Sequence, residues 1–197
     1  VEQLQSALTP RTKAIVLGYP SNPTGATMPR EALRRIVDFA VKHDLYIISD
    51  EIYDRLTYDG AHTCVSSLPG AWERTVLLNG FSKAYAMTGW RVGWMVLPEE
   101  LRRPVECLAQ NLFICPSTVA QHAALACFEP QSIAEYERRR AEFKARRDYF
   151  VPALNQLGLT VPVPPDGAFY AWADCSAACA RLGVKDSWEF AFEVMKR

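Results

Sequence analysis

Hydrophobic residues in the first half of the chain fall into short runs separated by polar loops. Apolar runs at residues 14–19, 45–49, 75–79 and 92–97 have the length and composition of buried β-strands. Between the first two runs, hydrophobic residues over 33–41 repeat at intervals of three and four positions, the pattern of a helix with one apolar face. A strand, a helix and a strand in this order predict a βαβ unit with a parallel sheet.

The middle of the chain has the pattern of helices. Two helices are predicted within residues 99–128, with a break near Cys115-Pro116. A long charged helix follows, and Ser132 is positioned to cap its N-terminus. We expect this helix to reach about Leu157 and to bend near its end, at Pro152.

The composition changes after the long helix. Residues 160–167 are rich in proline and predict an irregular connection. Residues 168–172, Ala-Phe-Tyr-Ala-Trp, are interpreted as an exposed edge strand. Two further helices are predicted at about 174–182 and 186–197.

These elements predict an α/β domain followed by part of a second domain. A boundary near residue 150 separates a sheet domain over 1–150 from a smaller α+β piece over 151–197. The chain opens on Val1 rather than Met and closes on an amphipathic helical pattern without a Gly or Pro stop. We therefore expect a piece of a longer protein, with both domains incomplete.

Composition and charge argue against several function classes. The 197 residues are 49% hydrophobic and 22% charged, as expected of a globular chain with a packed core. Lys and Arg equal Asp and Glu at 22 each, so no net charge attracts nucleic acid or an anionic membrane. No apolar run approaches the roughly 20 residues that span a bilayer, and the N-terminus lacks a secretory pattern. We expect a cytoplasmic protein without nucleic-acid or membrane partners.

The cysteines predict free, reduced thiols rather than disulfides or a metal site. None of the six belongs to a CxxC pair, and the three histidines stand apart from one another. The cysteines are Cys64, Cys107, Cys115, Cys127, Cys175 and Cys179.

Side chains suited to chemistry follow three of the predicted strands. In a parallel sheet the loops after these strands emerge at one edge, where ligands bind in α/β folds. A lysine in such a loop can act as a nucleophile toward a carbonyl group, and an arginine suits a phosphate. The candidate residues, in chain order, are Asn22, Asp50, Tyr53, Ser82, Lys83 and Arg91.

Each candidate also has a purely structural interpretation. Asn22 precedes a proline and could be a turn residue, and Ser82 could cap a helix. Asp50 and Glu51 could be the N-cap and the first-turn acid of a helix. Tyr53 could pack with its hydroxyl in water, and Arg91 could pair with a nearby acid such as Glu99. Lys83 could be a solvated surface charge. Their convergence at one edge favours the chemical interpretation.

Three motifs together resemble the class I and II aminotransferases, the fold-type I pyridoxal-phosphate enzymes of the aspartate aminotransferase group. The motifs are SNPTG at 21–25, DEIY at 50–53 and SKAYAMTGWRVG at 82–93. They occur in the order and at spacings compatible with that family, and PDGAFY at 165–170 extends the resemblance. The resemblance implies a large domain with a mostly parallel sheet and flanking helices, and part of a small α+β domain.

The resemblance also implies roles for the candidate residues. Lys83 would carry pyridoxal 5'-phosphate as a Schiff base and shuttle a proton, and Asp50 would keep the pyridine nitrogen protonated. Asn22 and Tyr53 would hydrogen-bond the phenolic oxygen and stabilise its anionic form. Ser82 and Arg91 would bind the phosphate. Lys83, Asp50 and Tyr53 are therefore the catalytic candidates.

The sequence departs from the family pattern in three ways. Gly80 stands where some members have a second phosphate-binding serine. The phosphate-cupping turn and ring-stacking aromatic of the family's N-terminal half are absent, as is the arginine that grips the substrate carboxylate. We therefore expect the 197-residue chain alone to be inactive, or nearly so.

The function that the resemblance implies is transfer of an amino group between an L-amino acid and a 2-oxo acid, by a homodimer. A C–S β-lyase of the same fold is an alternative that shares these motifs. The aminotransferase-like domain of a pyridoxal-phosphate-sensing transcription regulator is a second alternative, and a decayed fragment is a third. The complete set of candidate residues argues against decay.

Overall fold

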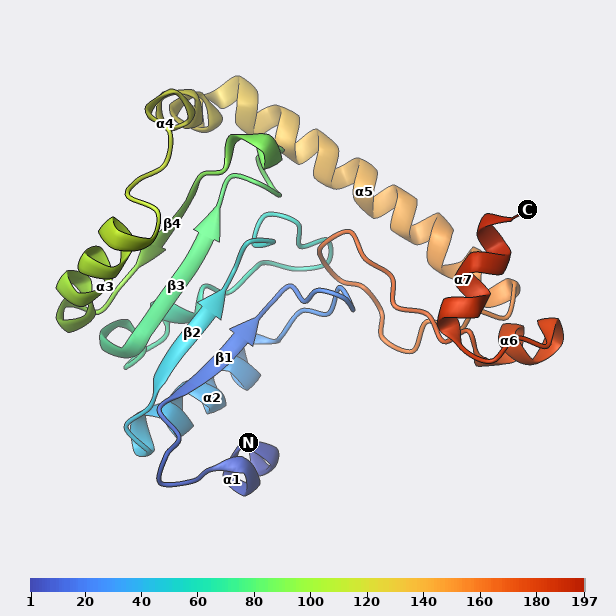
Figure 1. Cartoon of the computed structure of the whole chain (residues 1–197), viewed down its shortest axis with the longest axis horizontal. Coiled ribbons are helices and arrows are strands. Elements are labelled where there is room, and N and C mark those ends of the chain that lie inside the picture. The colour runs from blue at the N-terminus through green and yellow to red at the C-terminus, as the bar shows by residue number, and fades with distance from the viewer. Residues whose placement is uncertain (197) are drawn as a thin grey trace.

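The computed structural model describes residues 1–196, and its centre is a four-stranded sheet in the order β1-β2-β3-β4 (Figure 1). The strands are β1 (Ala14–Gly18), β2 (Tyr46–Asp50), β3 (Thr75–Gly80) and β4 (Gly93–Val96). β1, β2 and β3 are parallel, as the sequence predicts, and β4 is antiparallel to β3. The connection between β3 and β4 contains no crossover helix, so the chain turns back beside the strand it has just left.

Helix α2 (Arg30–Lys42) covers one face of this sheet. Its residues Leu33, Ile36, Val37 and Ala40 are buried against a core that includes Ile47 of β2. Burial of an aliphatic side chain of this size contributes roughly 1.5–3 kcal/mol, so this face holds the strands and the helix together. The predicted periodicity of this helix is confirmed.

The opposite face of the sheet is open. Val16 of β1 is 73% exposed, and Gly93 and Met95 of β4 are exposed as well. The prediction that each of these strands is buried on both faces is therefore wrong for this face, because no helix in residues 1–196 is packed across it.

The helices of the middle of the chain follow the predicted order. α3 (Glu99–Leu112) and α4 (Thr118–Leu125) confirm the predicted break between two helices. α5 (Pro130–Gln156) is the longest helix and contains Pro152. Ser132 does not cap it, contrary to expectation, because α5 begins two residues earlier, with Pro130 in its first turn.

The C-terminal part confirms two helices and contradicts one strand. α6 (Ser176–Leu182) and α7 (Ser187–Met195) lie where helices are predicted. Residues 168–172 form no strand, because Ala168 has a left-handed backbone with φ of 55°, and the isolated bridges of this region, Thr57 with Gly167 and Thr160 with Asp174, lie on either side of them.

Short elements complete the chain. Helix α1 (Glu2–Ala7) precedes the sheet. Single 3-10 turns lie at Val65–Ser67, Trp72–Arg74, Thr88–Trp90 and Ala126–Phe128. All six cysteines are free thiols. Within residues 1–196, no helix is both long and apolar enough to cross a membrane, and no group of three or more metal-binding side chains is present.

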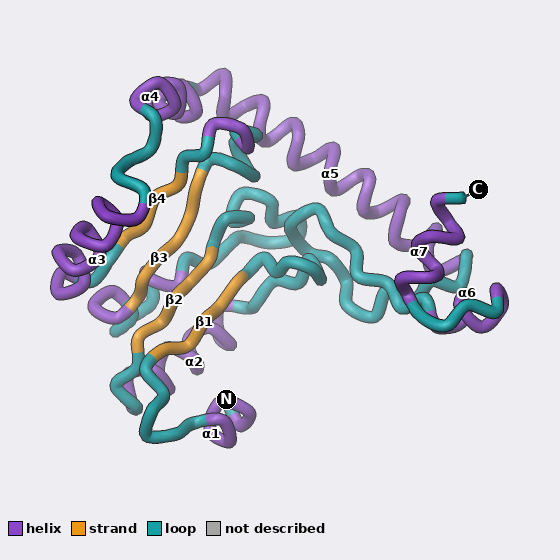
Figure 2. The backbone as a smooth tube through the Cα atoms, in the orientation of Figure 1, coloured by secondary structure: helices purple, strands orange, loops and turns teal. Residues whose placement is uncertain are grey.

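Helix α5 and the loops at the ends of the parallel strands enclose the region of the predicted site residues. In Figure 1, α5 runs from α4 beside the sheet to α6 and α7. It continues without a break through residue 150, where the sequence predicts a domain boundary. Figure 2 shows irregular segments gathered between the ends of the parallel strands and α5.

Candidate active site

The parallel strands bring their C-terminal ends to a single edge of the sheet. In the strand register, Gly18 at the end of β1 lies beside Asp50 at the end of β2, and Asp50 lies beside Leu78 of β3. The three loops that carry the predicted site residues start at this edge. The predicted convergence of these loops therefore follows from the register.

Lys83 lies in the loop after β3 and is half-buried. Its Nζ is 5.8 Å from the centre of the Phe169 ring, close enough for a cation–π contact. Lys83, Ser82 and Phe169 line a cavity of about 310 Å³. The loop is held by its own bonds, because the Thr88 hydroxyl donates to the Ser82 carbonyl at 2.9 Å. Its buried neighbours, which pack as one cluster with α4, include Phe81, Tyr85 and Met87.

Asp50 and Tyr53 belong to the turn after β2. Asp50 is exposed, and its Oδ1 accepts the Ile52 N–H at 3.1 Å. No helix follows, so the interpretation of Asp50 and Glu51 as a helix N-cap and first-turn acid is wrong. Tyr53 is only 5% exposed, and its hydroxyl is 2.7 Å from that of Tyr170. Burial and then this hydrogen bond raise the pKa of Tyr53, so its hydroxyl keeps its proton at neutral pH.

Asn22 and Arg91 lie at the outer ends of the site. Asn22 is exposed in the loop after β1, and Arg91 is exposed with a left-handed backbone. Arg91 Nη1 donates to the Thr88 carbonyl at 2.8 Å, which leaves its remaining N–H groups for an anion. Within residues 1–196, no hydrogen bond joins Asn22, Asp50 and Lys83 to one another, although their loops share an edge.

The side chains at this edge fit pyridoxal 5'-phosphate by their chemistry. Lys83 offers an amine for the aldehyde, and Asp50 offers a carboxylate for a protonated ring nitrogen. Tyr53 offers a protonated hydroxyl for the phenolic oxygen, and Arg91 offers a guanidinium for the phosphate. Each functional group of the cofactor therefore has a complementary side chain among these loops.

A distant segment ties two of these loops together, and sequence reasoning gave it no place in the site. The Gly167 N–H donates to the Gly25 carbonyl at 2.8 Å, and the Ala168 N–H donates to the Leu56 carbonyl at 2.7 Å. A Cβ added at Gly25 would lie 2.5 Å from Cβ of Pro165, so only glycine permits this approach. Residues 165–170 resemble the family as a motif, but the sequence contains no signal for these contacts.

A buried carboxylate next to Asp50 is a second feature that sequence reasoning missed. Glu51 is 2% exposed, and its Oε1 accepts the Ser49 hydroxyl and the Val65 N–H, both at 2.9 Å. Its Oε2 is 2.6 Å from His62 Nε2. Burial alone would raise the pKa of Glu51, but the hydrogen bonds from His62, Val65 and Ser49 outweigh it and lower that pKa. Glu51 therefore anchors the segment that follows β2.

Comparison with known proteins places these features in a family. The sequence profile described as aminotransferase class I and II matches residues 1–191. The chain is 42% identical over 172 residues to an aromatic-amino-acid aminotransferase from Thermococcus litoralis, covering 86% of this chain and 44% of that protein. It is 42% identical over 177 residues to an aspartate/prephenate aminotransferase from Thermus thermophilus, covering 89% of this chain and 45% of that protein.

Solved structures show the same arrangement. The aspartate aminotransferase from Thermus thermophilus with maleate superposes with a TM-score of 0.84 at 42% identity, over 89% of this chain and 46% of that one. An aromatic aminotransferase from Pyrococcus horikoshii gives a TM-score of 0.83 at 39% identity, over 87% of this chain and 46% of that one. The chain spans less than half the length of each of these relatives.

Proposed function

The chain belongs to the class I and II aminotransferases, and from this membership we propose that the full-length protein transfers an amino group between an L-amino acid and a 2-oxo acid. The observation that carries the proposal is the position of Lys83, after β3, at the edge where Asp50 ends β2. The names of the relatives, which are aminotransferases for aromatic amino acids and for aspartate and prephenate, support the reaction class.

Pyridoxal 5'-phosphate is the cofactor that we propose for this site, and when bound it supplies an electron sink for the carbanion at the substrate Cα. Lys83 would hold its aldehyde, and Ser82 and Arg91 would hold its phosphate. Asp50 would keep a proton on the ring nitrogen, because a carboxylate beside that nitrogen stabilises its charged form. Asn22 and Tyr53 would bond its phenolic oxygen.

Lys83 is the residue that we propose moves the proton. Its flexible side chain lies against Phe169 in a partly enclosed cavity, where an amine displaced from the cofactor stays close to the substrate Cα. Nζ would take the proton from Cα and deliver it to the cofactor carbon that carries the aldehyde, which lies beyond the substrate nitrogen. Tyr53 would act as a hydrogen-bond donor, since its raised pKa keeps its proton in place.

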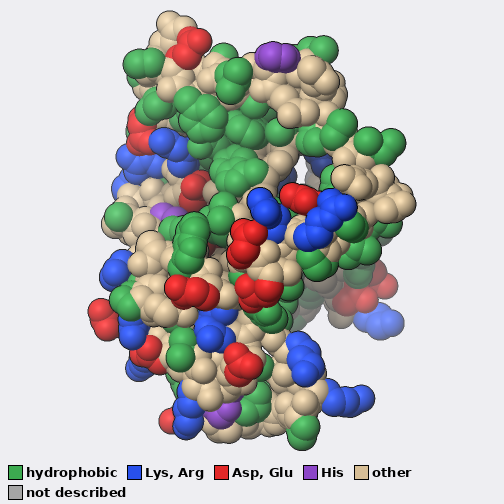
Figure 3. Space-filling model, turned by 90° about the vertical axis from the view of Figure 1, so that its left-hand side faces the viewer, with side chains coloured by type: hydrophobic (Ala, Val, Ile, Leu, Met, Phe, Trp, Pro, Cys, Tyr) green, Lys and Arg blue, Asp and Glu red, His purple; other side chains and the backbone are tan. Residues whose placement is uncertain are grey.

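We further propose a cytoplasmic homodimer in which the site is completed by the rest of the full-length protein. Large hydrophobic side chains gather on the side of the molecule that carries α3 and α4 (Figure 3). Leu112 and Ile114 there are 76% and 75% exposed, more than expected of a surface that faces water alone. A large domain over 1–150 and a small domain over 151–197 remain our proposed division.

The experiment compares absorbance spectra of the full-length protein, purified with pyridoxal 5'-phosphate, before and after borohydride. We expect a band near the visible edge that borohydride fixes covalently in the wild type. Lys83→Ala should not become labelled, whereas Lys42→Ala, which removes an exposed amine from the end of α2, should behave as the wild type. Labelling of Lys83→Ala to the wild-type extent would contradict the assignment.

A second assay separates the transferase from the C–S β-lyase. An aminotransferase consumes a 2-oxo acid only when an amino donor is present. A lyase instead releases pyruvate, ammonia and a thiol from a sulfur amino acid without any 2-oxo acid. Release of pyruvate in the absence of an acceptor would favour the lyase over the proposed function.

A further inference from the structure

Among residues 1–196, the polar partner of the Tyr53 side chain is the hydroxyl of Tyr170. The two hydroxyl oxygens are 2.7 Å apart, and the rings meet edge to face with centres 5.7 Å apart. Tyr170 belongs to the segment between α5 and α6, 117 residues after Tyr53. This contact therefore joins two parts of the fold that are remote in sequence.

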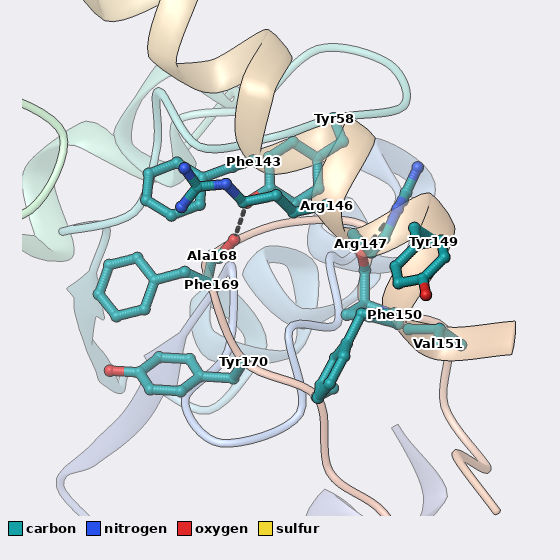
Figure 4. A pocket seen from close by; sticks show the side chains of 12 residues that line it. Tyr58, Phe143, Arg146, Arg147, Tyr149, Phe150, Val151, Ala168, Phe169 and Tyr170 are labelled. Carbon is teal, nitrogen blue, oxygen red and sulfur yellow. Dashed lines mark hydrogen bonds between the residues drawn. The ribbon is translucent and has the colours of Figure 1, made fainter. Parts of the chain in front are cut away.

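The backbone around Tyr170 is held on several sides. The Ala168 N–H donates to the Leu56 carbonyl at 2.7 Å, and the Tyr58 hydroxyl donates to the Ala168 carbonyl. Nη1 of Arg147 on α5 donates to the Pro165 carbonyl at 3.1 Å. Figure 4 shows the Phe169 and Tyr170 rings projecting to the same side of this segment. Tyr170 is thus presented to Tyr53 by fixed neighbours.

Packing also restricts the two tyrosine rings. The Phe169 ring lies 4.8 Å from the Tyr170 ring and meets the Tyr53 ring edge to face at 5.5 Å. Phe169 also contacts the Lys83 amine, so this one ring links the tyrosine pair to the amine. The hydroxyl pair therefore lies beside the proposed cofactor contacts and not on a remote surface.

The chemistry of two phenols sets the direction of the hydrogen bond. Each hydroxyl has one proton, so in any arrangement one oxygen donates and the other accepts. When Tyr53 donates its own proton to an acceptor in the site, its oxygen can only accept from Tyr170. A hydroxyl that accepts a hydrogen bond becomes a stronger donor, because chains of such bonds polarise one another.

We propose that Tyr170 is a positioning residue that donates its hydroxyl proton to the Tyr53 oxygen and thereby directs the Tyr53 proton toward the phenolic oxygen of the cofactor. This inference rests on the proposed function. Tyr170 acts through Tyr53 and makes no contact with the cofactor itself. It also makes the segment between α5 and α6 a part of the active site.

The test is the pH dependence of the absorbance of the full-length protein loaded with pyridoxal 5'-phosphate. The phenolic oxygen is negatively charged and lies near the protonated nitrogen that links Lys83 to the cofactor. A hydrogen bond to this oxygen neutralises part of its charge, so the linkage loses its proton more easily. In Tyr170→Phe this bond weakens, the linkage keeps its proton to higher pH, and the colour transition should move upward by about 0.5–1 pH unit.

Tyr149→Phe is the matched control. Tyr149 lines the same cavity of about 430 Å³ as Tyr170, but it projects from α5 and is 78% exposed. Removal of the Tyr149 hydroxyl should leave the colour transition at the wild-type pH. A shift of equal size in both variants would overturn the proposal, since it would show a general effect of removing a phenol.

A double-mutant cycle tests whether Tyr170 acts through Tyr53. Tyr53→Phe alone should shift the transition upward, and adding Tyr170→Phe to that variant should shift it no further. Additive shifts would overturn the proposal. A wild type without the visible band would contradict the proposed function instead, whereas a band with an unshifted transition in Tyr170→Phe would contradict this inference alone.

A cofactor-free measurement covers the case in which Tyr170→Phe fails to fold, which a thermal melt would reveal. Carbon-13 NMR of ring-labelled tyrosine follows each phenol in the wild-type apoprotein, and Tyr53→Phe identifies the Tyr53 signal. We expect that signal to titrate above the ordinary range of a tyrosine, because burial and the hydrogen bond with Tyr170 raise the pKa of Tyr53. Titration of the Tyr53 signal in the ordinary range would contradict the buried hydroxyl pair.

Discussion

At the scale of single residues, glycine allows the loops of the site to meet. Gly25 has a left-handed backbone with φ of 73°, and its carbonyl accepts the Gly167 N–H. A Cβ at Gly167 would lie 2.7 Å from Cβ of Pro20 and 2.8 Å from the Leu56 carbonyl oxygen. The hydrogen bonds between the loops need backbones this close, so side-chain volume is excluded at both positions.

Gly25→Ala should lower the free energy of unfolding by about 2–4 kcal/mol, the combined cost of a left-handed alanine and of overpacking. Gly60→Ala is the control, because Gly60 also has a positive φ, of 97°, but nothing lies within 4 Å of its added Cβ. That change should cost only about 1–2 kcal/mol of backbone strain. Urea unfolding measures both, and equal losses would contradict the close approach.

Glu51 gives the stability of the fold a dependence on pH. Its pKa is lowered in the folded protein from an ordinary value of 4.5, so its contribution is complete above that pH and is lost as pH falls through the lowered value. Glu51→Gln should cost about 1–3 kcal/mol at neutral pH, because charged hydrogen bonds become neutral ones, and less in acid. Urea unfolding at several pH values measures the loss, with the exposed Glu73→Gln as control.

The sequence predicted residues whose positions depend on local order, and it missed those that depend on distant partners. Lys83 and Asp50 were predicted at one edge because each follows a short apolar run, and strand ends are visible in such runs. Tyr170 and Gly167 have partners more than a hundred residues away. Nothing in the local pattern of residues 165–170 indicates which loops they touch.

At the scale of elements, α5 is stabilised by charge pairs and weakened by one proline. Glu135 pairs with Arg138 and Arg139 one turn later, and Lys144 pairs with Asp148. Each exposed pair of this kind adds little stability, because water and salt screen its charges. Pro152 lies in the helix interior, where it cannot donate a backbone hydrogen bond.

Pro152→Ala should raise the free energy of unfolding by about 1–3 kcal/mol, since it restores a backbone donor at an exposed helical position. Pro130→Ala is the internal control, because Pro130 lies in the first turn of the same helix, where no donor is missed. Thermal unfolding of both variants provides the comparison. A gain in stability for Pro130→Ala alone would contradict the assigned helix start.

Element prediction succeeded where periodicity decides and failed where tertiary contacts decide. The four strands lie within one residue of their predicted bounds, and the helix at 30–42 contains the predicted periodic stretch at 33–41. Residues 168–172 resemble a strand in sequence, but the Ala168 N–H donates to Leu56 and the Ala168 carbonyl accepts from Tyr58, both in the loop after β2. Ser132 resembles a cap, yet the preceding Pro130 already fits the helix start.

At the scale of the whole molecule, extensive apolar surface is exposed. Val16 lies on the open face of the sheet, Leu112 ends α3, and Ile114 lies between α3 and α4. Contiguous apolar patches favour association, whereas hydrophobic residues scattered singly over a surface do not. The relatives are about twice as long as this chain, so further polypeptide surrounds the matching region in them.

The 197-residue polypeptide studied alone should self-associate and bind a hydrophobic dye, and it should show little or no transamination. Light scattering after size exclusion measures self-association, and an amino-donor assay measures transamination. The full-length protein under the same conditions is the control and should bind less dye per residue. A monodisperse, active 197-residue polypeptide would contradict this expectation.

The bonds from residues 167–170 to the loops after β1 and β2 also set an order of events during biosynthesis. Ribosomes add about 5–20 residues per second, so roughly 6–23 s separate the synthesis of Tyr53 from that of Tyr170, 117 residues later. The β1–β2–β3 region emerges first and can pair early, but its loops lack their partner until then. Cofactor capture is therefore expected to be a late step, after most of this chain has left the ribosome.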